Sequence, residues 1–544
     1  MKNSDTKLST ERIEAIFSPK CNNFISLVNK ESGEDLIKTE PIFPLVSLFG
    51  LEGKEKKELL HVTLDQFDNM RNADFFIDSS LVVHNLRRIA FADKGGTVAD
   101  KHTRNYYLNG GKLIWLSYNG VSSKADSVLC CLAQVDSMGF DSESFGYSKI
   151  CKDLQRIRTL NFDSASNNIN NVYARLDYCL TKAFLCYAEG QKFGFTNPYA
   201  LFNRLDLRDS DSLHISYRSL YDIPTKRPDG NFLAEAFDAM HKDEKTISQY
   251  LKNIQPENPL YQLFLSKYRQ AASAAERRLA LCNMERSRWR HGDYPQMHNK
   301  YVVVNIPAQQ LLAVNNDERQ TMRVAIGALK TKTPLLTSRV KRMDFNPPWI
   351  IPKSIIRTSV RHHAGNSEYF ESHGYSIKER KTGKIVDPTV ATPEMLMSSD
   401  FLVMQRGGEG NALGRVIFRF DNDYSIYMHD TSSPGVFGRA NRMVSHGCIR
   451  VERPYELAVF MLNSRDDRLM SKMKEAMTMR INDNGDEPKR NINKSIRSKS
   501  IEPQVPLYIT YYTLYPNEQG TLISYPDIYG FDNVLYKAIS SFLK

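Results

Sequence analysis

The spacing of the apolar residues changes near Gly292, and this change divides the chain into two parts with different secondary structure. From Leu60 to about Gly292 the apolar residues recur at helical spacing, which predicts a mainly helical region. After Gly292 they form short runs rich in valine and isoleucine, which predicts strands. A chain that segregates its helices from its strands in this way is expected to be an α+β protein.

Two stretches give the clearest helical signal. Residues 171–187 carry apolar side chains at helical spacing, and Gly190 follows as the expected end of that helix. Residues 260–289 predict one long or broken helix, which ends where Gly292 and Pro295 interrupt the pattern.

Several short segments of the second part predict strands. "KYVVVNIP", "QQLLAV" and "TMRVAIG" are expected to be three strands, with "NNDE" as a turn between the last two. "GRVIFRF" and "YSIYMHD" are expected to pair as a hairpin, and "QVPLYITYYTLY" is expected to be a final strand. Pro454 suits the first turn of a helix that runs to Leu462, because proline lacks the N–H that this position leaves unbonded.

The expected organisation is a mainly helical N-terminal scaffold followed by a domain rich in strands. The boundaries are an N-terminal segment of uncertain structure (1–60), the scaffold (61–295), the strand-rich domain (296–481) with an irregular stretch (346–405), an exposed basic loop (482–500), and a C-terminal strand and helix that pack on either domain (501–544).

Composition sets broad limits on function. The chain has 544 residues, of which 41% are hydrophobic, so there is ample material for a core. The net charge of +11 would suit an anionic partner, but a solvated basic surface is the favoured interpretation. We find no motif for nucleic-acid binding and expect no nucleic-acid partner.

The eight cysteines indicate neither a disulfide framework nor a zinc site. They form no C-x-x-C pair, and most lie in apolar helical runs, where a free cysteine behaves as a small hydrophobic residue. We expect no metal and no cofactor. The N-terminus "MKNSDTKLSTERIEAIFSPK" lacks the apolar region of a signal peptide, and no apolar run approaches membrane-spanning length.

One cysteine lies in a different setting. In "MVSHGCIRVERP", Cys448 follows His446 and Gly447, and a loop separates it from the expected strand "YSIYMHD". Alternation along that strand places Tyr427 and His429 on the same face. The loop can return Cys448 to this face, where an imidazole would activate the thiol.

The same stretch offers groups that could stabilise an oxyanion. Gly447 gives the backbone freedom to turn, and the amides of Gly447 and Cys448 could donate to a developing negative charge, with the Tyr427 hydroxyl as a further donor. Three other interpretations stay open: Cys448 as core filler, His429 as a structural residue, and a metal site, for which no fourth ligand is evident.

The heptapeptide "SHGCIRV", with His429 upstream at the expected interval, resembles the signature of the L,D-transpeptidase (YkuD) catalytic domain. Further segments resemble the YcbB-type subfamily, and the likeness covers about residues 60–544. These segments are "YLNGGKLIWLS", "LDYCLTKAFLCYAEG", "NMERSRWR", "YVVVNIP", "KTPLLTSRV", "NPPWIIPKSI", "GNALGRVIFRFDNDYSIYMHDT", "RMVSHGCIRVERPYELA", "PLYITYYT" and "DIYGFD".

The resemblance implies a specific reaction on peptidoglycan. The donor is a tetrapeptide stem, from which the enzyme releases D-Ala while Cys448 holds the acyl group as a thioester. A diaminopimelate side-chain amine of another stem then attacks, which makes a 3→3 cross-link. The resemblance also implies acylation of Cys448 by carbapenems. Related alternatives are an L,D-carboxypeptidase, a lipoprotein-attaching transpeptidase, and, as a different class, a catalytically silent cell-wall scaffold.

The resemblance assigns roles to individual residues. Cys448 is the nucleophile and His429 the base, with Tyr427 and the amides of Gly447 and Cys448 as the oxyanion hole. Further positions follow the family pattern: Ser445, His446 and Arg450 would shape the pocket, and a purely structural role stays open for all three. The resemblance also implies a mixed β-sandwich catalytic domain at 296–481 with an inserted capping subdomain at 346–405, to which Trp349, Tyr369 and Tyr375 would belong; a place in the core is the alternative for Trp349. Asp430 follows His429, but neighbouring strand residues point to opposite faces, so its carboxylate is not expected to reach the imidazole.

The resemblance also implies a place and partners. The family acts in the periplasm or cell envelope, so we expect the export signal to lie outside the numbered chain; delivery by a secretion system is the less favoured route. The expected partners are donor and acceptor stem peptides, with other cell-wall enzymes as further candidates. The sequence sets no oligomeric state.

Overall fold

The computed structural model describes residues 77–117, 120–159, 161–211, 214–462, 466–478, 496–517 and 519–543. The expected N-terminal segment 1–60 and residues 482–495 of the expected basic loop lie outside this set. The end of that loop is described, and the expectation of a loop there is wrong. Ser498–Ser500 begin strand β18 (Ser498–Thr510), because they pair with Asp344–Arg342 of strand β9 (Leu335–Phe345).

The chain forms two compact units, which are described separately. The first consists, within the described residues, of 77–197, 225–290 and 532–543, and the second of 198–224 and 291–531. The division differs from the predicted boundary at residue 295, because residues 198–224 and 291–295 belong to the second unit. Residues 198–224 join the second unit because strand β5 (Tyr221–Asp222) pairs with β9.

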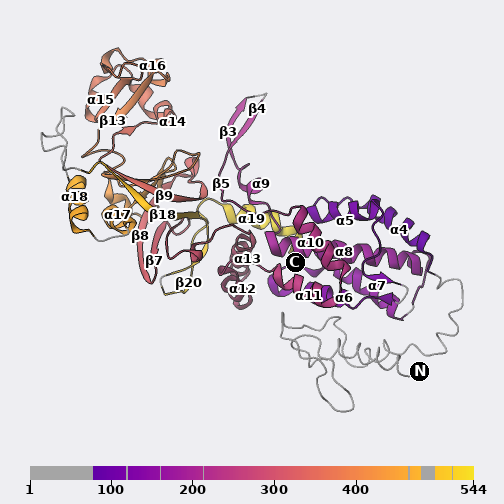
Figure 1. Cartoon of the computed structure of the whole chain (residues 1–544). Coiled ribbons are helices and arrows are strands. Elements are labelled where there is room, and N and C mark those ends of the chain that lie inside the picture. The colour runs from indigo at the N-terminus through magenta and orange to yellow at the C-terminus, as the bar shows by residue number, and fades with distance from the viewer. Residues whose placement is uncertain are drawn as a thin grey trace, which may run out of the picture. The chain divides into compact units, whose positions relative to one another are not determined.

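The first unit is helical apart from a short hairpin in its described residues (Figure 1). Its helices are α4 (Ser79–Ala92), α5 (Val98–Leu108), α6 (Lys124–Ala133), α7 (Tyr147–Thr159), α8 (Ile169–Phe193), α10 (Gly230–His241), α11 (Glu244–Asn253), α12 (Leu260–Gln270), α13 (Ala274–Arg288) and most of α19 (Phe531–Ile539). Strands β1 (Leu116–Ser117) and β2 (Gly120–Val121) form the hairpin. The expected helix at 260–289 is therefore broken between α12 and α13.

Helix α8 is the centre of this unit, and α4, α5, α6, α7 and α13 all pack against it. It begins where the Asn168 side chain accepts a hydrogen bond from the Asn171 N–H. It does not end at Gly190 as predicted. Gly190 is buried within the helix, where a Cβ would lie 2.2 Å from the Phe195 ring. The helix instead ends before Gly194, whose φ of +87° suits glycine.

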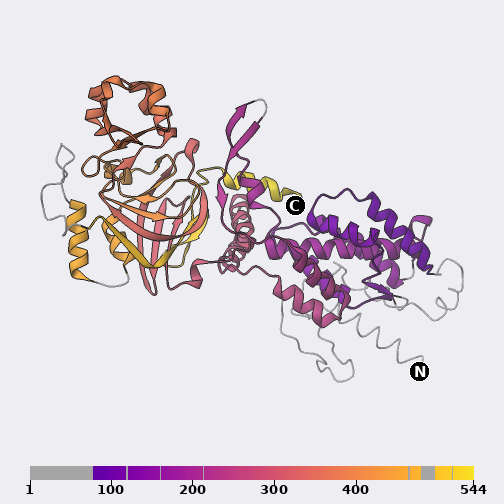
Figure 2. The same ribbon diagram turned by 45° about the horizontal axis from the view of Figure 1, so that its top comes forward.

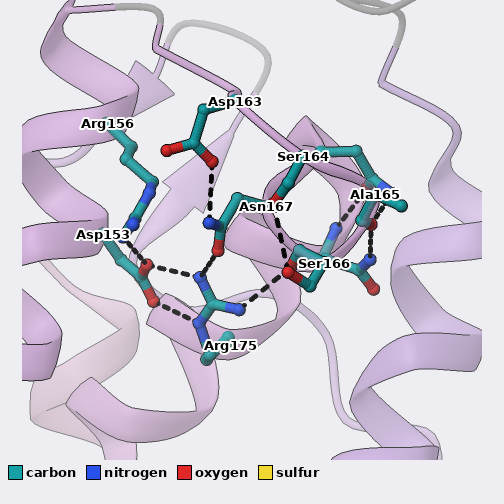
Figure 3. A network of polar contacts seen from close by, with 10 residues as sticks. Asp153, Arg156, Asp163, Ser164, Ala165, Ser166, Asn167 and Arg175 are labelled. Carbon is teal, nitrogen blue, oxygen red and sulfur yellow. Dashed lines mark hydrogen bonds and ion pairs between the residues drawn. The ribbon is translucent and has the colours of Figure 1, made fainter.

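A partly buried ion pair joins α7 to α8 and holds the loop that precedes α8 (Figure 3). The Arg175 guanidinium donates to both carboxylate oxygens of Asp153 at 2.6 Å. It also donates to the Ser166 carbonyl and to Asn167 Oδ1, and Asn167 in turn donates to Asp163. Because Asp153 is only 2% exposed, its carboxylate oxygens depend on Arg175 for the hydrogen bonds that water would otherwise supply.

The second unit contains a mixed sheet whose strands return on themselves. The order β14-β15-β17-β8-β7-β6-β18-β9 is closed by a further pairing between β9 and β14, with β5 outside β9 and β16 beside β8. Figure 2 shows these strands curving round one another. The strands not yet bounded are β6 (Lys300–Asn305), β7 (Gln310–Asn315), β8 (Glu318–Gly327), β14 (Val416–Phe420), β15 (Met428–His429), β16 (Met443–Ser445) and β17 (Ile449–Val451).

The predicted strands β6, β7 and β8 form an antiparallel meander, and β18 lies between β6 and β9. The expected last strand at 504–515 is divided, because residues 504–510 belong to β18 while Leu514 and Tyr515 belong to β19 (Leu514–Pro516). Outside the large sheet lie helices α9 (Pro198–Phe202), α17 (Pro454–Met461) and α18 (Asp467–Thr478), and the hairpins β3 (Asp206–Asp211) with β4 (His214–Arg218) and β19 (Leu514–Pro516) with β20 (Leu522–Ser524). Helices and strands are thus segregated, and the α+β prediction is confirmed.

A smaller sheet with its own core forms between β9 and β14. Its strand order is β10-β13-β11-β12, and Ile356, Phe370, Ile377 and Leu396 are completely buried in its core. Its elements are β10 (Trp349–Ile350), α14 (Lys353–Ile355), α15 (Ser367–Ser372), β11 (Tyr375–Glu379), β12 (Ile385–Val386), α16 (Pro393–Met397) and β13 (Phe401–Gln405). We call residues 349–405 the inserted subdomain.

Candidate active site

His429 lies at the end of β15, a strand of two residues that is held on both sides. It pairs with Ile417 of β14 and, in parallel, with Arg450 of β17. The expected strand from Tyr424 is shorter than predicted, because Ser425 has a φ of +55° and the ladder starts only at Met428. His429 is 4% exposed, so the sheet fixes the position of its imidazole.

Tyr427 lies beside His429 although it precedes the strand. The two rings meet edge to face with centroids 5.8 Å apart, and the Arg419 guanidinium lies 5.8 Å from the Tyr427 ring centroid. The Trp349 side chain hydrogen-bonds to the Tyr427 hydroxyl. Burial is the main reason that the pKa of Tyr427 is raised, so its hydroxyl stays protonated and can donate a hydrogen bond.

Cys448 immediately precedes β17 and faces the backbone of Tyr427. The Ile449 N–H donates to the Tyr427 carbonyl at 3.0 Å, and the Tyr427 backbone hydrogen-bonds to the Cys448 thiol. Tyr427, His429 and Cys448 are thus brought together on two neighbouring parallel strands and the residues just before them.

Within the turn from Ser445 to Cys448, the Ser445 hydroxyl makes two hydrogen bonds. Ser445 Oγ accepts from the Gly447 N–H at 3.1 Å and donates to the Cys448 carbonyl at 2.6 Å. Gly447 has a φ of +118°, which side chains disfavour, and an added Cβ would lie 3.4 Å from Ile426. The Gly447 amide, predicted as an oxyanion donor, is therefore already engaged within the turn. His446 is exposed at its tip.

The thiol and the imidazole are both neutral at pH 7. Burial raises the pKa of Cys448 to about 11, and the Tyr427 backbone and the Arg450 charge oppose this rise only in part. Burial, reinforced by the charge of Arg450, lowers the pKa of His429 to about 4. The backbone of Asp430 and of Leu413 favours the protonated ring, but their effect is smaller. His429 is therefore a neutral imidazole at pH 7.

Arg450 is the cation that acts on both Cys448 and His429. It pairs in register with His429, and its buried Nε has no hydrogen-bond partner among the described residues. Its charge favours the thiolate of Cys448 and disfavours the imidazolium of His429. It also contributes, after burial, to the lowered pKa of His446.

Asp430 faces away from the imidazole, in agreement with the alternation argument. Its carboxylate accepts from the Arg415 N–H at 2.8 Å and from the Thr431 N–H. Gly414 lies against it, and an added Cβ there would meet Asp430 at 2.4 Å. Asp430 therefore fixes the loop between β13 and β14 and is not a partner of the imidazole.

The residues predicted for the inserted subdomain fall into two groups. Trp349 reaches the site through its contact with Tyr427. Tyr369 and Tyr375 belong to an aromatic cluster with His363 and His373, in which Tyr369 stacks on His363 at 3.8 Å. No hydrogen bond or ring contact joins Tyr369 or Tyr375 to the Cys448 site in the part of the chain that is described.

Sequence reasoning missed the loop that supports the turn. Thr331 and Thr333, which follow β8, donate their hydroxyls to the carbonyls of Ser445 and Gly447 at 2.8 and 2.9 Å. The fragment "KTPLL" is part of the family resemblance, but nothing in its composition indicates these long-range contacts.

The described residues contain no group of three or more His, Cys, Asp or Glu side chains arranged to hold a metal ion. None of their helices combines the length and the apolar character needed to cross a membrane.

Comparison with known proteins places this geometry in a family. Residues 299–466 match the L,D-transpeptidase catalytic domain (YkuD), and residues 100–266 match the Scaffold domain. A Haemophilus influenzae protein named "Putative L,D-transpeptidase" is 31% identical over 244 residues, which are 44% of this chain and 45% of that protein. The chain thus matches less than half the length of this curated relative.

A solved L,D-transpeptidase from Mycobacterium smegmatis is 14% identical, with a TM-score of 0.18; the match covers 39% of this chain and 58% of that one. The two family matches include α8 in the first unit and the whole of the Tyr427, His429 and Cys448 site in the second. The chain therefore belongs to the proteins that carry a YkuD L,D-transpeptidase catalytic domain together with a Scaffold domain.

Proposed function

We propose that the protein is a peptidoglycan L,D-transpeptidase that forms 3→3 cross-links through a thioester on Cys448. The observation that carries this proposal is the meeting of Cys448, His429 and Tyr427 within the segment that matches the YkuD catalytic domain. A thiol, a neutral imidazole and a protonated phenol are the parts that an acyl transfer requires.

In the first half-reaction Cys448 Sγ attacks the carbonyl of the diaminopimelate residue that precedes D-Ala. Because both groups are neutral at pH 7, the thiol proton passes to His429 as the carbon–sulfur bond forms. The carbonyl oxygen becomes an oxyanion, which the Tyr427 hydroxyl and the Cys448 N–H stabilise. The carbon–nitrogen bond then breaks, and D-Ala leaves with the proton from His429.

In the second half-reaction the side-chain amine of another diaminopimelate attacks the thioester. His429 takes a proton from that amine and returns it to the sulfur as the carbon–sulfur bond breaks. Arg450 lowers the free energy of the departing thiolate. Ser445 and Gly447 hold the turn, and Trp349 orients the Tyr427 hydroxyl. Each residue role here is a proposal, as is action in the periplasm or cell envelope.

The test is a reaction with defined disaccharide tetrapeptides, read by mass spectrometry. The parent chain is expected to give dimers that have lost one D-Ala, and Cys448→Ala is expected to give none. Cys179→Ala is the matched control, because Cys179 is also partly buried but lies in the first unit.

The products separate the competing functions. Tripeptides without dimers would identify an L,D-carboxypeptidase, and transfer to a lysine peptide would identify the lipoprotein-attaching reaction. Dimers from Cys448→Ala would refute the thioester. Bound but unchanged muropeptides would indicate the silent scaffold.

A further inference from the structure

We propose that Thr333 is a positioning residue that aims the backbone N–H of Cys448 at the oxyanion, and that Tyr529 anchors it. This inference rests on the proposed acyl transfer. It concerns which amide of the turn can stabilise negative charge and what holds that amide in place.

The hydrogen bonds of the turn leave one amide beside the sulfur available. The Gly447 N–H donates to Ser445 Oγ, so that amide is occupied. The Cys448 N–H has no hydrogen-bond partner among the described residues. Of the two amides that sequence reasoning placed in the oxyanion hole, only that of Cys448 can donate without first breaking a bond within the turn.

Thr333 fixes the direction of this amide. Its hydroxyl lies 2.9 Å from the Gly327 N–H and 2.9 Å from the Gly447 carbonyl oxygen, and the residue is completely buried. Since an amide N–H can only donate, the hydroxyl must accept from Gly327 and donate to Gly447. The hydroxyl proton therefore points to the Gly447 carbonyl oxygen, and this hydrogen bond fixes the direction of that carbonyl.

Peptide geometry carries this constraint to Cys448. The Gly447–Cys448 peptide is trans, because Glu502–Pro503 is the cis bond that the described residues contain. In a trans peptide the C=O and the following N–H are coplanar and point in opposite directions. Holding the Gly447 carbonyl toward Thr333 thus turns the Cys448 N–H to the opposite side of the chain, away from Thr333 and free to meet substrate.

A second hydroxyl holds the loop that bears Thr333. Tyr529 Oη accepts from the Thr333 N–H at 3.2 Å and donates to the Gly327 carbonyl at 2.6 Å. The Tyr529 N–H donates to Tyr511 Oη, which donates to Asp527. Tyr529 is buried, so this chain of bonds connects a segment after β18 to the turn at Cys448.

Gly327 is required for this arrangement. An added Cβ would lie 2.1 Å from the Thr331 carbonyl oxygen and 2.6 Å from the Thr333 nitrogen, which is too close for any side chain. The loop therefore closes tightly on β8, and this brings Thr333 under Gly447.

Thr331 provides a matched comparison two residues away. It donates to the Ser445 carbonyl at 2.8 Å, but that carbonyl also accepts from the Ala328 N–H at 2.9 Å. The peptide that it holds carries the N–H of His446, not that of Cys448. Loss of the Thr331 hydroxyl should therefore leave the Cys448 amide in place.

The experiment compares two reactions of Cys448 in Thr333→Val, Thr333→Ser and Thr331→Val. Acylation by a carbapenem creates an oxyanion and is followed by the loss of β-lactam absorbance. Alkylation by iodoacetamide displaces iodide at a saturated carbon, creates no oxyanion, and is followed by the mass of the Cys448 peptide. Thermal unfolding of each variant shows that it is folded.

Thr333→Val should lower the limiting acylation rate by about tenfold or more. Complete loss of an oxyanion donor lowers the rate about 10²–10³-fold, and a donor that is present but misdirected should lower it by a smaller factor. The half-saturating concentration and the alkylation rate should change by less than about twofold. Thr333→Ser and Thr331→Val should both acylate within about threefold of the parent, because each keeps the bond to the Gly447 carbonyl.

Three results would overturn the inference alone: Thr333→Val acylated as fast as the parent, acylation and alkylation falling together, or Thr333→Ser as slow as Thr333→Val. A folded parent that the carbapenem does not acylate would refute the proposed function, and the inference with it.

Discussion

Replacing Arg450 by methionine should move the acidic limit of Cys448 acylation to higher pH. In the proposed mechanism, acylation requires His429 without its proton. The pKa of His429 is lowered to about 4, first by burial and then by the charge of Arg450. Methionine keeps much of the side-chain volume and removes the charge. The imidazolium then loses a repulsive neighbour, so the pKa of His429 rises and the base is protonated at a higher pH.

The size of the change follows from the strand geometry. His429 and Arg450 are register partners on adjacent parallel strands, which lie about 4.8 Å apart, so their charged groups are about 6 Å apart. At that distance Coulomb's law gives about 0.7–2.8 kcal/mol for effective dielectric constants of 80 to 20, or about 0.5–2 pH units. Arg450 is partly exposed, so we expect about one pH unit.

The assay is the rate of carbapenem acylation between pH 3 and 8, with circular dichroism to show that each sample is folded. The parent rate should fall by half near pH 4 and that of Arg450→Met near pH 5. Arg419→Met is the matched control, because Arg419 lies over the Tyr427 ring but does not act on His429. The electrostatic reasoning would be refuted if the acidic limit of acylation in Arg450→Met stayed at the pH of the parent or moved to lower pH.

Three further predictions concern the turn and the first unit. Gly447→Ala should destabilise the turn by about 1–3 kcal/mol and slow acylation, since its φ of +118° disfavours a side chain; thermal unfolding and acylation rates test both. Arg175→Ala should lower the free energy of unfolding by about 2–4 kcal/mol, and Arg156→Ala by less, because only Arg175 binds both Asp153 oxygens; denaturant titration compares them. Burial raises the pKa of Asp177 to about 6, above its unfolded value, so the free energy of unfolding should fall by about 3 kcal/mol as the pH rises from below 4 to above 6. Asp177→Asn should abolish this fall, which denaturant titrations at several pH values would measure.

The sequence predicts those features that depend on neighbours along the chain. The meander β6–β8 follows from alternating apolar runs, and the helix that begins at Pro454 follows from the lack of an N–H in proline. The family resemblance adds the link between His429 and Cys448. Their approach requires the parallel pairing of β15 with β17, which no local pattern specifies.

What the sequence could not predict depends on contacts between distant segments. A glycine is typical of a helix end, yet Gly190 lies inside α8, where the Phe195 ring packs so closely that a Cβ would clash with it. The engagement of the Gly447 amide depends on the rotamer of Ser445, and the role of Thr333 depends on a loop more than a hundred positions upstream. Local spacing contains no information about such meetings.

The position of β18 between β6 and β9 has a consequence for how the protein is made. Both neighbours of β18 are translated well before it, and β18 lies outside the matched segment 299–466. Until residues 498–510 leave the ribosome, β6 and β9 each present an unpaired edge, which is a template for aggregation. The matched segment that holds the thiol and the imidazole thus lacks one strand of its own sheet, and a nascent chain completes that sheet only after residues 498–510 have been made.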